Sequence, residues 1–147
     1  MIGVVVICGF CAASAATALR AAQAPSSTAP IPGSGQSVSS GVYNEAQAKR
    51  GESISLRKCV ICHGDELLGN EAPTLVGPDF LGNWTTRTLG DLFDRTKKTM
   101  PADAPGALSL QETADLLAYV LSLNRFPAGE KELPSDIAIL NQIRMEK

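Results

Sequence analysis

The sequence predicts an all-α fold, a small domain of about three to five helices joined by long loops. Helical signals occur at about 43–58, 88–98 and 109–126. The stretch 64–90 is rich in glycine and proline, which favours loops with one or two short turns. No segment keeps the alternation of apolar and polar residues that marks a strand. At 147 residues, the chain has the length of one domain.

Each predicted helix has its own local signal. Asn44 is placed to cap the first helix. The second helix has apolar residues at helical spacing in Leu89, Leu92 and Phe93. The third begins with a capping box at 109–112, in which a Ser hydroxyl and a Glu carboxylate satisfy free backbone N–H groups. We expect these helices to form the domain's core.

The ends of the chain differ in composition from its middle. Residues 1–24 are mostly apolar and read as a signal peptide, with a retained N-terminal membrane anchor as the alternative. Residues 25–42 are small and polar and read as a flexible linker. The helical domain is then expected at 43–126 and a C-terminal extension at 127–147.

Charge and cysteine content exclude some classes of function. The net charge is −2 and there is no basic run, so we expect no nucleic-acid partner. The four cysteines form two pairs, Cys8 with Cys11 and Cys59 with Cys62, which is not the spacing of a disulfide framework. The chain has one histidine, His63, directly after Cys62.

Residues 59–63 read Cys-Val-Ile-Cys-His, the C-x-x-C-H attachment pattern of a c-type haem. Two thiols at this spacing reach the two vinyl groups along one edge of the porphyrin. His63 then lies under the iron and supplies a proximal imidazole. The sequence therefore predicts one haem c, with iron, held covalently through Cys59 and Cys62.

Two other readings of the cysteine pair remain open. A structural zinc site needs four ligands, and this part of the chain offers only Cys59, Cys62 and His63. A redox-active dithiol of the thioredoxin type expects a βαβ context, which the surrounding sequence lacks. The sequence supports both of these readings less well than it supports haem attachment.

Met100 is the candidate second axial ligand of the iron. A second histidine does not exist, and Met1 and Met145 lie at the chain ends, where tethering is poor. Met100 lies between two predicted helices, and Pro101 restricts it to extended conformations. A thioether is a common haem ligand that raises the potential. The alternative is a methionine that only fills the core.

With these residues, the chain resembles a class I c-type cytochrome domain of the bacterial periplasmic kind over about 43–126. The resemblance implies a small cytochrome c fold around one covalently bound haem. Residues 72–77 are similar to that family's G-P-x-L-x-G loop, with Ala72 in place of the first glycine. By this resemblance, the Pro73 carbonyl accepts a hydrogen bond from His63 Nδ1 and fixes the ring.

The resemblance also implies a contact between the first and last helices. Gly51 matches the small residue at their crossing, and Tyr119 is its expected aromatic partner. Ser55 stands where the family often has an aromatic residue. Trp84 is expected to pack on the haem or to donate its N–H to a propionate, with an ordinary core aromatic as the alternative.

The expected function is electron transfer rather than catalysis, in the periplasm, with membrane attachment only if the N-terminal segment is retained. An iron held on both faces has no free site for a substrate. Expected partners are a dehydrogenase as donor and an oxidase as acceptor, met transiently or as a permanent subunit. Segments 77–81, 99–103 and 124–129, together with Trp84, also look like cytochrome domains found beside quinoprotein-type dehydrogenases. A small peroxidase is the rival; without a second histidine, it would need Arg87 or Arg95 as its distal group.

Overall fold

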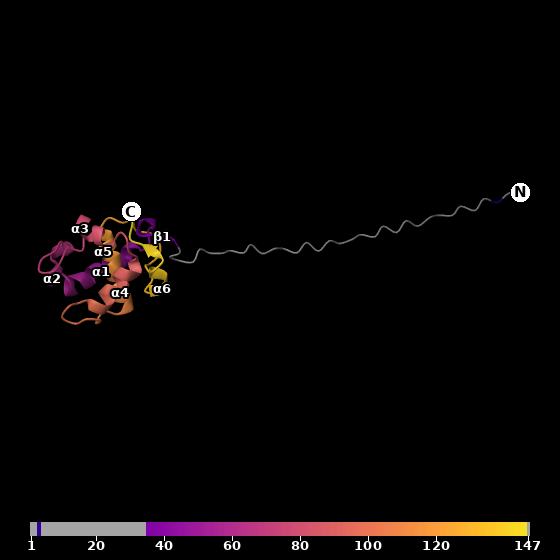
Figure 1. The fold of residues 1–147 in the computed structure, drawn as a ribbon. Helices are drawn as coiled ribbons and strands as arrows, with labels where there is room; N and C mark the ends of the chain where they lie inside the picture. The colour runs from indigo at the N-terminus through magenta and orange to yellow at the C-terminus, as the bar shows by residue number, and fades with distance from the viewer. Residues whose placement is uncertain (1–2, 4–34, 147) are drawn as a thin grey trace.

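The computed structural model describes residues 3 and 35–146, so the predictions for 1–24 and for most of 25–42 lie outside the described part apart from residue 3. The α-helices within it are α1 (Glu45–Lys58), α2 (Val60–His63), α3 (Gly77–Trp84), α4 (Leu89–Thr99), α5 (Leu110–Leu123) and α6 (Ile137–Leu140). Short 3₁₀-helices occupy Val38–Ser40 and Asp65–Leu67, and two short strands are β1 (Gln36–Ser37) and β2 (Ile143–Arg144). The all-α class is confirmed (Figure 1), although α2 and α6, of four residues each, bring the helices above the expected number.

The three helices predicted from the sequence are present close to the expected positions. The Asn44 side chain accepts a hydrogen bond from the Gln47 N–H and caps α1. Ser109 and Glu112 form the predicted capping box at the start of α5. A second capping box, between Thr88 and Asp91, starts α4. These polar bonds fix where the helices begin.

The helix α3 was not expected, because its two glycines and one proline favour a loop. Pro78 lies in the first turn of α3, where a missing N–H costs nothing. Phe80 is buried in the hydrophobic core, and Leu81 and Trp84 pack against that core. Burial of this apolar face therefore outweighs the low helix propensity of the segment.

The predicted crossing of α1 and α5 is confirmed at Gly51. A Cβ atom on Gly51 would overlap the backbone carbonyl of Asp115 and would come within 2.9 Å of the Tyr119 Cβ. The two backbones therefore touch at a point where only glycine fits. Ser55, one turn further along α1, is buried at this interface.

A polar network ties the same two helices together beside the crossing. Asp115 is 4% exposed and receives two hydrogen bonds from the Arg50 guanidinium, at 2.8 and 2.9 Å. Gln111 donates a third, at 2.8 Å. Burial raises the pKa of the Asp115 carboxyl, but the hydrogen bonds from Arg50, Gln111 and Gln47 outweigh it, so the pKa is lowered overall.

The C-terminal segment 127–146 packs onto the helical domain. Leu133, Leu140, Ile143 and Met145 are each at most 1% exposed and belong to the main hydrophobic core. Gln47 of α1 is fully buried, and its amide bonds both backbone groups of Leu133: Nε2 donates to the carbonyl at 2.9 Å and Oε1 accepts from the N–H at 2.6 Å. The segment thus completes the core that α1 begins.

The two ends of the described chain meet in the parallel pair of β1 and β2. The Glu146 carbonyl accepts hydrogen bonds from the Ser37 and Ser39 hydroxyls, at 2.5 and 3.0 Å. This pair lies on the side of the domain away from α2 (Figure 1). No helix in the described part of the chain is both long and apolar enough to cross a membrane.

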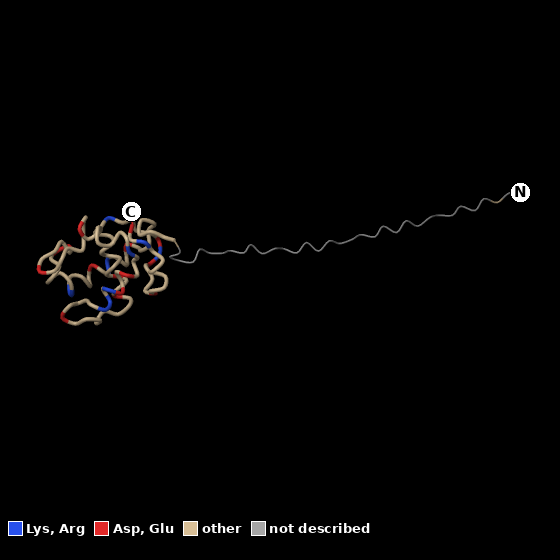
Figure 2. Tube along the Cα trace, viewed as in Figure 1, with Lys and Arg blue, Asp and Glu red and all other residues tan. Residues whose placement is uncertain are grey.

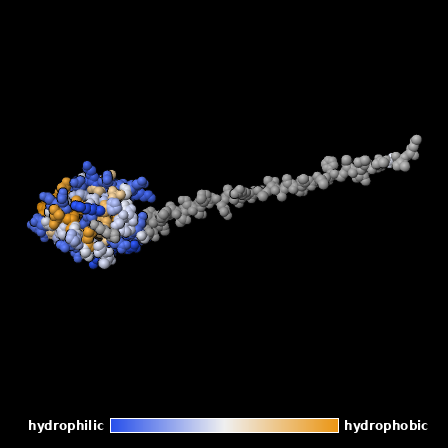
Figure 3. Space-filling view, turned by 90° about the horizontal axis from the view of Figure 1, so that it is seen from above, coloured by the Kyte–Doolittle hydropathy of each residue, from blue (hydrophilic) through white to orange (hydrophobic). Residues whose placement is uncertain are grey.

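Charged residues of both signs are interspersed along the folded chain (Figure 2). Hydrophobic side chains gather instead at the end of the domain where α2 lies (Figure 3). Exposed large apolar residues there include Ile61, within the Cys-Val-Ile-Cys-His motif, and Leu68 just beyond it.

Replacing Gly51 by alanine should destabilise the domain, because the added Cβ forces α1 and α5 apart. We expect a loss of about 2–3 kcal/mol in the free energy of unfolding, the upper range for overpacking. Gly82→Ala in α3 is the matched control, since its Cβ would meet no atom within 4 Å. Denaturant unfolding should place the Gly82→Ala midpoint at or above that of the wild type. Equal effects of the two changes would contradict the close crossing.

Asp115 should make folding stability depend on acid pH. Because its folded-state pKa lies below the unfolded value of about 3.9, the stabilisation is present above that pH and is lost as the pH falls through the folded-state pKa. Asp115→Asn should therefore lower stability at pH 7 and flatten the acid limb of the stability curve below about pH 4. The exposed Glu130→Gln serves as control and should keep the wild-type curve. An unchanged acid limb in Asp115→Asn would contradict this role.

Candidate haem site

A cavity of about 1580 Å³ lies between α2, α4, α5 and the loops 71–75 and 100–108. Its volume exceeds the roughly 300–1,000 Å³ of common ligand pockets. Its apolar walls include Leu92 from α4 and Leu116, Leu117 and Val120 from α5. The cavity therefore has room for a large, flat, mostly apolar group.

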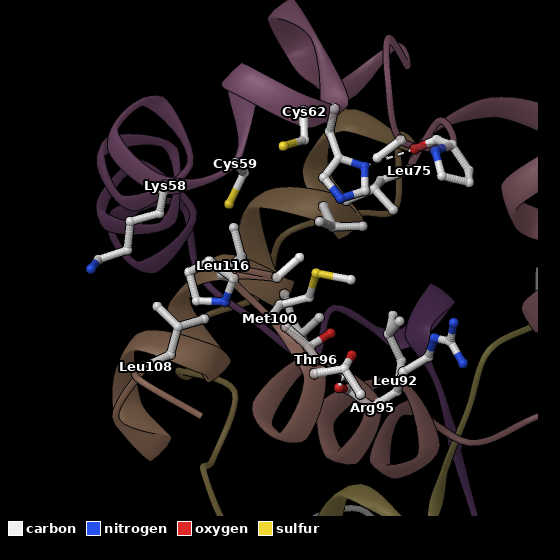
Figure 4. Close-up of a pocket in the computed structure, with 18 of the residues that line it drawn as sticks. Lys58, Cys59, Cys62, Leu75, Leu92, Arg95, Thr96, Met100, Leu108 and Leu116 are labelled. Carbon is white, nitrogen blue, oxygen red and sulfur yellow. Dashed lines mark hydrogen bonds between the residues drawn. The ribbon is translucent and has the colours of Figure 1, made fainter. Parts of the chain in front are cut away.

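Cys59 and Cys62 enter this cavity from the junction of α1 and α2. Cys59 ends α1, where its N–H bonds the Ser55 carbonyl at 2.8 Å. The single turn of α2 follows, closed by bonds from the Cys62 and His63 N–H groups to the Cys59 carbonyl at 3.1 and 2.9 Å. Figure 4 shows both cysteine sulfurs directed into the cavity. Both thiols are free.

His63 is 8% exposed and lines the cavity. Its Nδ1 lies 2.7 Å from the Pro73 carbonyl oxygen, the contact implied by the sequence resemblance. Because a carbonyl oxygen only accepts, Nδ1 carries the proton in this bond. The unprotonated Nε2 is then the nitrogen available to a metal ion.

The loop that carries Pro73 is held at both ends. The Ala72 N–H bonds the Cys62 carbonyl at 2.9 Å. Asn124, at the end of α5, donates to the Leu75 carbonyl and accepts from the Gly77 N–H, each at 3.0 Å. Asn124 is a positioning residue that the sequence analysis missed, because nothing in its local sequence indicates contact with residues 75–77.

Met100 enters the cavity from the side opposite the two cysteines (Figure 4). It directly follows α4, and its backbone is extended, with φ −120° and ψ 151°, as expected for a residue before proline. Met145 is instead fully buried in the hydrophobic core and does not line the cavity. Met100 is thus the methionine among the described residues that faces the cavity.

Trp84 and Arg87 also line the cavity. The Arg87 guanidinium lies 5.5 Å from the centre of the Trp84 ring, within cation–π range. Trp84 also packs at a tilt on Phe80, with ring centres 6.2 Å apart. The structure therefore brings Trp84 to the same cavity as Cys59, Cys62, His63, Met100 and Pro73.

The donor set fits a c-type haem better than the other readings of the cysteine pair. No group of three or more His, Cys, Asp or Glu side chains that could hold a metal ion occurs among the described residues. The cysteines lie at the junction of α1 and α2, away from the two-residue strands β1 and β2, which is not the βαβ context of a dithiol site. A large cavity with two thiols, one imidazole and one thioether matches a covalently attached porphyrin.

Burial of Cys59 affects the reactivity of its thiol before the haem is attached. Burial raises the pKa of the Cys59 thiol, and the nearby Ser55 hydroxyl partly opposes this. That hydroxyl is buried and acts on the pKa of the Cys59 thiol through a hydrogen bond between the two side chains.

Comparison with known families identifies the domain. The family model described as cytochrome c oxidase, cbb3-type, subunit III, matches residues 46–120. The chain belongs to this family of cytochrome c domains. The matched range contains Cys59 and Cys62 of the attachment motif, together with His63 and Met100. Neither a curated protein nor a solved structure matches the chain.

Membership of this family establishes the chemistry of the domain in general terms. The domain is a class I cytochrome c domain that binds a c-type haem and serves electron transport. The cysteines of the motif have the spacing of haem attachment. Bacterial domains of this family are typically periplasmic.

Haem attachment through Cys59 and Cys62 predicts a haem that resists extraction. When the chain is expressed with haem-maturation machinery, denaturing mass spectrometry should show the haem mass added to the protein. Cys59→Ala with Cys62→Ala should abolish this addition. Replacing Cys8 and Cys11 by alanine is the control and should leave it unchanged. If acid–acetone extraction removed the haem from the wild type, covalent attachment would be contradicted.

Proposed function

We propose that this protein is a single-haem electron carrier in which His63 and Met100 are the two axial ligands of the iron. The observation that carries the proposal is that His63 and Met100 line one cavity, beside the two cysteines that attach the haem. Bound in this site, the haem supplies a reversible one-electron couple. A site closed on both faces leaves no position for a substrate, which supports a carrier rather than an enzyme.

His63 acts as the proximal ligand through Nε2, and the Pro73 carbonyl sets its orientation. The 2.7 Å bond at Nδ1 fixes the ring plane and its tautomer and makes the imidazole a stronger donor. Asn124 supports this arrangement by anchoring the loop behind Pro73 to α5. A ligand that does not reorient between redox states keeps reorganisation small, as electron transfer requires.

Met100 closes the other face with a thioether, a soft and weak donor that favours the reduced iron and raises the potential. Leu92, Leu116 and Leu117 line the same cavity and give it an apolar wall. Trp84, with Arg87 stacked on it, supplies an N–H donor and a cation at the cavity wall, chemistry suited to haem propionates.

The proposed partners are redox proteins of the periplasm, with a dehydrogenase as donor and an oxidase as terminal acceptor. The family, whose description names a subunit of an oxidase, supports the acceptor. The exposed apolar surface around Ile61 lies on the haem-attachment motif itself and offers a small contact area of the kind that transient redox complexes use. Size-exclusion chromatography of the native protein distinguishes a free carrier from a permanent subunit.

The optical spectrum of the oxidised holoprotein tests the proposal. The wild type should be low-spin, with the weak far-red band that marks a sulfur ligand on ferric haem. Met100→Ala should lose this band and become high-spin when oxidised, should bind carbon monoxide readily once reduced, and should have a lower potential. Met145→Leu is the matched control and should keep the wild-type spectrum, because Met145 lies in the core away from the cavity.

A wild type that is high-spin when oxidised, and that once reduced binds carbon monoxide without losing a strong ligand, would refute the His/Met site. It would point instead to an open iron and ligand-activating chemistry. The same spectrum in wild type and Met100→Ala would assign the sixth position to another group.

A further inference from the structure

The loop that carries Met100 has few bonds to the rest of the domain. It runs from the end of α4 to the start of α5, and residues 102–105 within it are exposed. Two short-range backbone bonds shape it, from the Ala104 N–H to the Pro101 carbonyl and from the Ala107 N–H to the Ala104 carbonyl. Leu108 anchors its far end by burial against Ile54 and Leu116. The Met100 N–H bonds the Thr96 carbonyl in the last turn of α4 at 3.0 Å and holds the start of the loop, whereas these local turns are the backbone bonds that shape residues 101–107.

One side chain connects this loop back to α4. The Lys97 ammonium, from the last turn of α4, donates to the Gly106 carbonyl at 2.7 Å. Among the described residues, no other side chain forms a hydrogen bond to the backbone of residues 100–107. Gly106 has φ +82°, a conformation that favours glycine and turns its carbonyl toward the lysine. The Lys97 bond therefore closes residues 97–106 into a ring that contains Met100.

We propose that Lys97 is a positioning residue that keeps the Met100 thioether on the haem iron by holding this loop closed. The inference rests on the proposed His/Met ligation. A thioether is a weak ligand, so its persistence depends on how rarely the loop that carries it opens. A charge-assisted hydrogen bond across the loop is stronger than a neutral one and makes opening rarer. Lys97 does not line the cavity, so it acts only through Met100.

Lys98 provides an internal comparison at the next position. It carries the same charge, but its side chain is 69% exposed and pairs with Asp94 on its own helix, at 2.8 Å. Lys98 also lines the cavity, whereas Lys97 does not. A change at Lys98 therefore removes an equal charge nearer the haem without opening the loop. Comparison of variants at the two positions therefore separates the effect of the Lys97 hydrogen bond from the effect of losing a positive charge.

The test is the rate at which added imidazole replaces Met100 in the oxidised, full-length holoprotein. Stopped-flow loss of the far-red band at saturating imidazole reports how often the thioether leaves. Lys97→Met keeps the length of the side chain but removes its donor, and we expect replacement about tenfold faster. Lys97→Arg, which keeps a cationic donor, should restore the rate to within about twofold of wild type. Lys98→Met should change the rate less than about twofold.

Three results would overturn the inference. Wild-type rates in Lys97→Met, with the far-red band intact, would overturn it while leaving the His/Met proposal in place. Equal acceleration in Lys97→Met and Lys98→Met would assign the effect to charge. A wild type without the band would instead overturn the proposed ligation, and the role of Lys97 with it.

Discussion

The contact between α1 and α5 at Gly51 is the constraint on which the haem site depends. The end of α1 places Cys59, and the single turn after it places Cys62 and His63. The middle of α5 supplies the apolar wall on which a haem would lie. Any separation of the two helices would therefore move the covalent attachment points away from that wall. The Arg50–Asp115 ion pair next to Gly51 also holds α1 and α5 in this relative position, by electrostatic attraction.

Much of the fold and of the site could be predicted because the signals are local. Asn44 and the Ser109–Glu112 pair act within one helical turn, and their predicted caps are present. The cysteine motif is also local, since its spacing alone indicates the cofactor. The family resemblance added the Gly51 crossing and the hydrogen bond between His63 and Pro73, both of which the structure contains.

The missed features depend on residues far apart in the sequence. Helix α3 forms although its glycines favour a loop, because the core buries Phe80. Asn124 bonds residues 75–77 across 47 and 49 positions, and Gln47 bonds Leu133 across 86. Short sequence patterns do not reveal such pairs. The place of Met100 in the cavity depends in the same way on distant residues, because α4 and α5 together position the loop that carries it.

The pairing of β1 with β2 has a practical consequence for work on electrodes. Both strands lie on the side of the domain away from α2 and the exposed Ile61 (Figure 1). A protein immobilised through an attachment point next to β2 would turn its haem-attachment face to the solution. The same protein adsorbed through the apolar surface around Ile61 would turn that face to the electrode surface. The choice of attachment point would thus decide whether current flows directly to the electrode or only through a dissolved redox partner.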